Sequence, residues 1–295
     1  MPLYVQELGG NEASFGVILS SAMVPAVLCI GLLIRYPEKL RPHVVVAVAV
    51  VLYALGAGGA ALVSESWTPL VGIGVLLGTA WAVVYTATPM VMSGMVTDAG
   101  RATYFGYLTG TQQVGIGAGP VIARLLVETD LGYRGTFAVV GVVCLVAVAF
   151  TGAVGSLTRS SEPDVAAGGE ERGAAPSFGE AIGKILRSEA VFSLVMIGLF
   201  ACLFTSLTQF QTTFASSRNL DYSVFYVAYT VAVIASRFGL APLVSRFEPR
   251  LVIAVSVSVM ALSVGAFLVV GSNALLYGLA SAFVGLGYGL ALPSV

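Results

Sequence analysis

The run VVVAVAVVLYALGAGGAALVS at residues 44–64 decides the fold class of this chain. It carries no charged side chain, and at about 1.5 Å per residue a helix of this length crosses the roughly 30 Å hydrocarbon core of a bilayer. A strand of a membrane barrel would alternate polar and apolar residues, which this run does not do. Because lipid offers no partner to open backbone groups, the run predicts a transmembrane helix.

Further apolar runs accompany it, each bounded by charged or turn residues. The predicted spans are 14–34, 44–64, 69–94, 103–127, 135–155, 190–214, 223–244, 251–271 and 274–295. The chain is 57% hydrophobic and only 10% charged, whereas soluble domains carry about 25% charged residues. This composition excludes a soluble enzyme, a disordered chain and a disulfide scaffold. It predicts an all-α integral membrane protein of about nine transmembrane helices in the lipid bilayer, and the net charge of -1 argues against a nucleic acid partner.

Basic residues gather on one side of the predicted spans. Of the 14 Lys and Arg residues, Arg134 and Arg218 lie on one side, and Arg124 and Arg237 lie within spans. All the others fall in loops on the opposite side: 35–43, 95–102, 156–189 and 245–250. The positive-inside rule then places the N-terminus of this chain outside and its C-terminus in the cytoplasm of a multi-pass cell membrane protein.

One long polar stretch, residues 156–189, divides the chain into a half-bundle at 1–155 and another at 190–295. Its Ser, Pro, Gly and Glu content is typical of a linker, and its charge predicts a cytoplasmic one. The two parts share a pattern, because Gly78-Thr79-Ala80-Trp81 is echoed by Gly285-Leu286-Gly287-Tyr288. Parallel repeats on either side of a central loop are a transporter design.

The runs 44–64, 135–155 and 251–271 are almost featureless, whereas the others contain proline, glutamine, tyrosine, threonine or arginine. Featureless helices are expected to face lipid, and the others to face protein or a cavity. The featureless runs recur at every third span.

Because featureless runs recur at every third span and one long polar loop divides the chain, it resembles the major facilitator superfamily of secondary transporters. In that family helices three, six, nine and twelve face lipid. The resemblance implies that residues 1–155 correspond to helices two to six of twelve and residues 190–295 to helices seven to ten. The chain is then expected to be truncated and inactive by itself. The family implies secondary active transport of a small organic solute by alternating access, driven by a solute gradient or by a coupling proton or ion.

The sharpest local motif lies in the span 103–127. Gly115, Gly119 and Ala123 stand four residues apart, which gives a flat helix face that a neighbour can approach closely, and Pro120 predicts a bend. The motif resembles the glycine-proline motif of the fifth helix in antiporter branches of the family, which implies an efflux antiporter. Arg124 departs from it, because a small residue is usual there. Ordinary packing and a moving interface between the halves remain alternatives.

Arg237 lies deep in the span 223–244, where a cation costs several kcal/mol unless it is paired or wetted. All 15 Asp and Glu residues map to loops or span ends. Three roles remain open for Arg237: a structural or gating ion pair, extension toward the cytoplasm, or contact with substrate. Arg124 is nearer the outer face, where we expect it to extend into water rather than to pair with Glu128.

Polar and aromatic residues of the remaining helices are candidates for a solute pathway. They are Trp81, Tyr85, Gln112, Gln113, Gln209, Gln211 and Tyr288. Amide and aromatic groups suit a partly apolar organic solute, and the alternative is that they make helix–helix hydrogen bonds.

No nucleophile–base pair, metal cluster or phosphate loop can be assembled from this sequence. The only histidine is His43, and the three cysteines, Cys29, Cys144 and Cys202, sit in apolar runs at no metal spacing. We therefore expect no enzyme activity, no metal and no other cofactor. The alternative function is that of a non-transporting membrane protein, or an inactive fragment, with the same fold.

Overall fold

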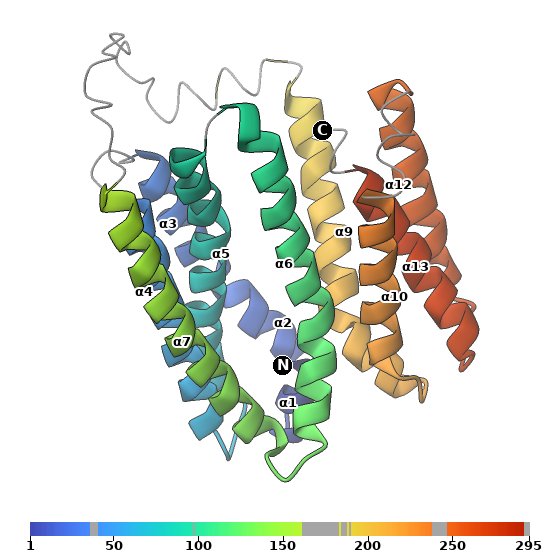
Figure 1. Ribbon diagram of the computed structural model, residues 1–295. Helices are drawn as coiled ribbons and strands as arrows, with labels where there is room; N and C mark the ends of the chain where they lie inside the picture. The colour runs from blue at the N-terminus through green and yellow to red at the C-terminus, as the bar shows by residue number, and fades with distance from the viewer. Residues whose placement is uncertain are drawn as a thin grey trace.

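The computed structural model describes residues 1–35, 41–96, 98–160, 183, 188, 190–237 and 247–291. Every regular element in these ranges is helical, as the sequence predicts. In chain order the helices are α1 (Pro2–Glu7), α2 (Glu12–Ser21), α3 (Met23–Arg35), α4 (Pro42–Leu62), α5 (Pro69–Met95), α6 (Asp98–Val127), α7 (Gly132–Ser160), α9 (Ala190–Ser217), α10 (Tyr222–Ala235), α12 (Pro249–Ala266) and α13 (Ala274–Ala291) (Figure 1).

The first predicted span is two helices rather than one. Helix α2 ends at Ser21, and α3 begins at Met23. Pro25 explains the break, because it has no amide hydrogen for the carbonyl of Ser21. At its other end α2 is well capped, since the Asn11 side chain accepts a hydrogen bond from the Ser14 amide at 2.9 Å.

Other boundaries differ from the sequence prediction, and α6 begins at Asp98 rather than at 103. Helix α7 continues to Ser160, so the first residues of the predicted linker are helical. Helix α12 ends at Ala266, five residues before the predicted end at 271, and turns follow up to Gly271, whose φ is +55°. Residues 161–182, which make up most of the predicted linker, lie outside the described residues, and so do 238–246 and 292–295.

Four stretches of the described residues are long and apolar enough to cross a membrane: Glu12–Leu33, Pro42–Leu62, Pro69–Met95 and Gly132–Ala153. Three shorter apolar helices occupy Tyr222–Ala235, Leu251–Ala266 and Ala274–Leu290. Helix α6, with 30 residues, is also long enough at 1.5 Å per residue. Its Gln and Thr side chains make it more polar than the others, which is expected of a helix that faces other protein or a cavity.

The helices pack as two groups on either side of α6. Helix α4 packs against α5 and α7, while α13 packs against α10 and α12. Figure 1 shows α4 and α7 at one edge of the molecule, α12 and α13 at the other, and α6 between the groups. The outward faces of α7 and α12 are apolar, with Val143 and Leu262 among their exposed side chains. Helices α7 and α12 thus expose the apolar surface that contact with lipid requires, and the contact itself stays a prediction.

The helices alternate in direction, so one end of the bundle carries the loops 63–68, 128–131, 218–221 and 267–273. We call it the Asp221 end. At this end a buried hydrophobic cluster packs around α1. Within it the Tyr4 hydroxyl donates to the carbonyl oxygens of Ala60 at 3.0 Å and Val63 at 2.6 Å. Phe15 of α2 meets Phe210 of α9 edge to face, with ring centroids 5.5 Å apart. The two helix groups are therefore in contact at this end.

Candidate functional site

Helices α6 and α10 form the main contact between the two groups, and Gly117 is the residue that lets them approach. A Cβ atom on Gly117 would collide with the Thr230 side chain. Gly115 and Gly119 have open space instead, with nothing within 4 Å of a built Cβ. The expectation of close packing at Gly115 and Gly119 is thus wrong for this structure, because α6 is rotated so that Gly117 faces α10.

Arg124 joins the same two helices at the Asp221 end. Its guanidinium pairs with Asp221, its Nε lies 2.7 Å from Glu128 Oε1, and its Nη1 donates to Ser223 Oγ at 3.3 Å. The expected extension into water is therefore replaced by an ion-pair cluster, since Asp221 at the start of α10 lies beside the end of α6. This also explains how a charged residue can stand where the glycine-proline motif has a small one.

The ion-pair cluster lowers the pKa of the Asp221 carboxyl. Partial burial raises the pKa of its carboxyl, but hydrogen bonds from Arg124 and from the Ser223 amide, together with the Arg124 charge, outweigh that effect. The net result is a pKa below the ordinary value of 3.8, so Asp221 is ionised at neutral pH.

Gln113 is the centre of a polar cluster deeper between α6, α10 and α13. Its side chain is buried, and its Oε1 accepts a hydrogen bond from the Tyr229 hydroxyl at 3.3 Å. Tyr288 of α13 lies beside Tyr229. Aromatic rings surround the cluster. The Phe204 ring of α9 stacks on the Tyr288 ring with centroids 4.4 Å apart, and the Tyr229 and Tyr288 ring centroids are 5.8 Å apart.

Trp81 and Tyr85 form a separate aromatic pair on α5. Their rings stack at a centroid distance of 5.1 Å, and both are exposed, at 56% and 48%. The structure therefore brings the predicted pathway residues Gln113 and Tyr288 together around Tyr229, and it pairs Trp81 with Tyr85 on α5.

The other predicted pathway residues lie elsewhere. Gln211 is buried in the aromatic core of the C-terminal helices, where its Oε1 accepts a hydrogen bond from the Tyr277 hydroxyl at 3.0 Å. Gln112 and Gln209 are partly buried. Gln112 follows a different face of α6 from Gln113, because neighbouring helical residues point about 100° apart.

Arg237 lies at the far end of α10. Ser236 and Arg237 continue this helix as a π-helical turn, a feature frequent at functional sites. The Arg237 side chain is partly buried, and its Nε is buried without a hydrogen-bond partner. Ser236, the residue before it, packs against Gly289 of α13.

Sequence reasoning missed Tyr229, Phe204 and Gly117. A signal existed for Tyr229, because Tyr222, Tyr226 and Tyr229 follow the spacing of one helix face. No comparable signal marks Phe204 or Gly117, whose roles depend on how neighbouring helices are rotated.

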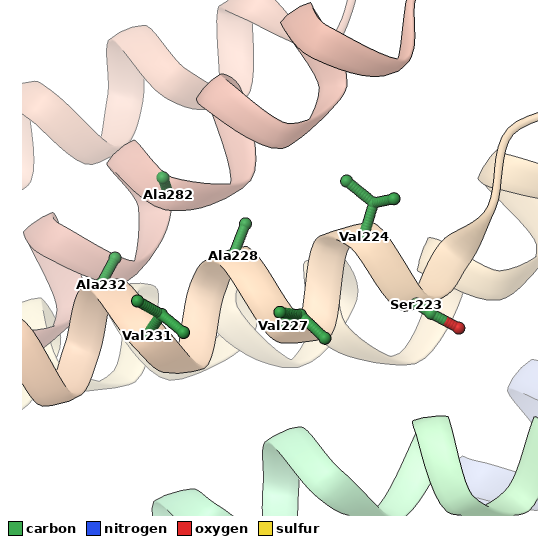
Figure 2. A pocket seen from close by; sticks show the side chains of 7 residues that line it. All are labelled: Ser223, Val224, Val227, Ala228, Val231, Ala232 and Ala282. Carbon is green, nitrogen blue, oxygen red and sulfur yellow. The ribbon is translucent and has the colours of Figure 1, made fainter.

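A separate depression lies on the flank of α10 and α13, with a volume of about 540 Å³. Figure 2 shows its lining along α10, with Ala282 contributed by α13. The lining is Ser223, Val224, Val227, Ala228, Val231, Ala232 and Ala282. Its only polar side chain is Ser223, and it contains none of the pathway candidates, so it is an apolar furrow rather than part of the polar cluster.

The described residues hold no group of three or more His, Cys, Asp or Glu side chains that could bind a metal ion. Cys29, Cys144 and Cys202 are free thiols.

Comparison with known proteins places the fold. A family model described as Major Facilitator Superfamily matches residues 1–295. A crystal structure of a mutant of the nucleoside transporter NupG matches with a TM-score of 0.67 and 17% sequence identity, over 97% of this chain and 74% of that one. At this identity the likeness is one of fold alone. No curated protein matches this chain.

Proposed function

Because the chain belongs to the major facilitator superfamily, we propose that it is a membrane transporter that moves a small organic solute by secondary active transport. The solute site is the cluster of Gln113, Tyr229 and Tyr288 with the exposed Trp81–Tyr85 pair. The observation that carries this proposal is the meeting of Gln113 of α6, Tyr229 of α10 and Tyr288 of α13 in one buried polar and aromatic cluster. A few polar groups within an aromatic wall are what a small-molecule site requires.

The transport mechanism is alternating access. We assign 1–155 and 190–295 as the two rocking bodies, joined by the linker 156–189. In this structure the Arg124–Asp221 pair and the Phe15–Phe210 contact hold the bodies together at the Asp221 end. These contacts must separate when that end opens. The close packing of Gly117 of α6 against Thr230 of α10 lies deeper in the bundle, and we assign it as the pivot about which the two bodies rotate.

Efflux by antiport is the transport mode that we favour. Pro120 lies inside α6 and weakens its hydrogen-bond ladder, so the helix can bend there. Gly115 and Gly119, which have open space beside them, give α6 room to slide or tilt as the interface moves. Exchange against a coupling proton, another ion or a second solute is consistent with this mode.

The orientation follows the charge asymmetry of the loops. The Asp221 end faces outward, and both Arg35 and Arg41 lie at the opposite, cytoplasmic end. The chain then spans a cell membrane with its N-terminus outside and its C-terminus in the cytoplasm.

Solute flux into vesicles from cells that express the complete gene tests this function. The panel includes nucleosides, because the similar solved structure is that of a nucleoside transporter, together with aromatic acids and amides. Saturable accumulation that collapses with an imposed gradient supports the proposal.

The alternative is a membrane protein of the same fold that does not transport. Flux through the same vesicles that does not exceed the flux through vesicles lacking the protein would favour this alternative. The same measurement on the 295 residues alone shows whether they carry flux by themselves.

A further inference from the structure

The apolar furrow along α10 and α13 has the shape and the neighbouring charges of a lipid site. We propose that it binds one phospholipid of the leaflet at the Asp221 end. One acyl chain lies in the furrow, and a head group with a primary ammonium lies against the cluster of Arg124, Asp221 and Glu128. This inference goes beyond the proposed transport function and does not depend on it.

Small side chains form the furrow where two helices pack closely. A Cβ atom on Gly285 of α13 would lie 2.9 Å from the Cβ atom of Ala232, so this glycine lets α13 approach α10. Ala228, Ala232 and Ala282 then leave a hollow of about 540 Å³ along the seam between the helices. Its wall is apolar, which suits a hydrocarbon chain.

The open side of the furrow is apolar surface. Among the described helices α10 packs mainly against α6, α9 and α13. Val227 and Val231 line the furrow and are 50% and 61% exposed, so they point away from these neighbours. Exposed apolar surface of this kind on a membrane protein is suited to contact with lipid. The bilayer is therefore the source of the occupant.

The length of the furrow matches one leaflet. Its lining follows α10 from Ser223 to Ala232 (Figure 2). At 1.5 Å per residue this is about 14 Å, and one leaflet supplies roughly half of the 30 Å hydrocarbon core. A groove for another transmembrane helix would be expected to run across the whole core. A single acyl chain that enters at the Asp221 end fits the observed length better.

Ser223 connects the furrow to charged groups. It lines the end of the furrow at the start of α10, and its Oγ accepts a hydrogen bond from Arg124 Nη1 at 3.3 Å. Arg124 also pairs with Glu128 and with Asp221, whose side chains are 56% and 42% exposed. The cluster therefore has two carboxyl groups for one guanidinium. This excess of acid is accessible where the head group of a lipid in the furrow would lie.

The excess of acid selects the head group by charge. A primary ammonium carries three N–H donors for the carboxylates of Asp221 and Glu128, and the lipid phosphate can then lie toward Arg124. A trimethylammonium group has the same charge but no donor. A head group without an amine adds negative charge where negative charge is already in excess. We therefore expect phosphatidylethanolamine to bind better than phosphatidylcholine, and phosphatidylglycerol to bind least.

Photo-crosslinking of the purified chain in phosphatidylcholine nanodiscs tests the proposal. The three phospholipids, each with a diazirine on one acyl chain, are added in turn as an equal minor share. Trypsin cleavage after Arg218 and Arg237 releases peptide 219–237, which contains the α10 side of the furrow, and cleavage after Arg134 and Arg159 releases peptide 135–159 from α7 as the internal control. The ratio of adducts on 219–237 to adducts on 135–159 should be about threefold higher with phosphatidylethanolamine than with phosphatidylcholine, because a partly exposed ion pair contributes modestly.

Charge variants isolate the head group. Glu128→Gln removes the excess of acid and should abolish the preference for phosphatidylethanolamine over phosphatidylcholine. The double variant Glu128→Gln, Asp221→Asn leaves Arg124 without a carboxylate and should turn the preference toward phosphatidylglycerol. Asp130→Asn, in the exposed loop after α6, is the control and should leave the order unchanged. A purely structural role of the cluster would change the adducts of all three lipids alike.

A filled furrow isolates the acyl chain. Ala228→Phe places a ring in the furrow and should lower the adducts on peptide 219–237 with every probe. Val143→Phe adds a ring to the exposed apolar face of α7 and should not change them. If a variant does not fold, the comparison of the three lipids on the parent chain still tests the proposal.

Equal ratios for the three lipids, or a ratio that is highest with phosphatidylglycerol, would overturn the proposed head group. Adducts that spread over 219–237 and 135–159 alike with every probe would show ordinary contact with the bilayer and overturn the site. Absence of lipid adducts from 219–237 would assign the furrow to another occupant, such as a second copy of the chain, and would overturn the proposal as well.

Discussion

The Arg124 guanidinium pairs with the Asp221 carboxylate, and this contact ties the end of α6 to the start of α10. The two residues are 97 positions apart and belong to the two bodies that we expect to rock. Glu128, one turn beyond Arg124 and directly after the end of α6, pairs with the same guanidinium. Opening of the Asp221 end can therefore release Asp221 while Arg124 stays paired.

Asp221→Asn should lower the unfolding free energy by about 0.5–1 kcal/mol, since the pair is partly exposed and such pairs contribute little. The loss should shrink in an Arg124→Gln background, because the partner is already gone. Thermal unfolding in detergent measures both. Asp130→Asn, in the exposed loop after α6, is the control, and an equal effect there would contradict the pair's role.

The same pair predicts a pH dependence. The folded pKa of Asp221 lies below its ordinary 3.8. A carboxyl with a depressed folded pKa stabilises the protein above its unfolded pKa and loses that effect as the pH falls through the folded value. The stability difference between the parent and Asp221→Asn should thus be constant near neutral pH, begin to shrink as the pH approaches 3.8, and vanish only below the lower folded pKa. A difference that grows in acid would show the opposite sign.

Gly117→Ala should destabilise the packing of α6 on α10, because the new methyl group meets the Thr230 side chain. Overpacking of this kind costs about 1–3 kcal/mol. Gly119→Ala, two residues further along α6 with open space around it, should be neutral or slightly stabilising. Unfolding in detergent compares the two, and equal tolerance at both positions would contradict the observed rotation of α6.

The apolar runs allowed the spans to be predicted well, because run length is a local property of the chain. The run 69–94 became α5 almost at its expected ends, and the run 103–127 became α6, which ends at the expected residue but begins at Asp98. The break at Ala22 was missed because a proline within a transmembrane helix is tolerated, so Pro25 in the middle of the predicted span does not by itself predict a second helix.

The site was predicted only in part, because it depends on helix rotation. Gly115 and Gly119 have the favoured four-residue spacing, yet Gly117 faces the neighbour. Gln211 looked like a pathway residue, and its amide instead accepts a hydrogen bond from Tyr277 within the aromatic core. The partner of Arg124 lies on another helix, so no pattern in α6 alone could have identified Asp221.

Tyr229→Phe should cost about 1 kcal/mol of stability, since it removes the hydrogen bond to Gln113 between α6 and α10. In a Gln113→Leu background the cost should be smaller. Tyr107→Phe, at an exposed ring on α6, is the control. Additive losses in the double variant would show that the two residues do not interact.

Cysteine labelling tests the proposed orientation. Ser64→Cys and Ser216→Cys place exposed thiols at the Asp221 end, and Ser93→Cys places one near the opposite end of α5. Cys29, Cys144 and Cys202 are first replaced by alanine. In intact cells an impermeant maleimide should react at positions 64 and 216 and spare position 93. The reverse pattern would overturn the topology.

Solute accumulation in vesicles from cells that express the complete gene tests the central claim of secondary transport most directly. The account predicts saturable uptake or exchange that requires an imposed proton, ion or counter-solute gradient and stops when the gradient is dissipated. Flux that is indifferent to every such gradient would contradict it.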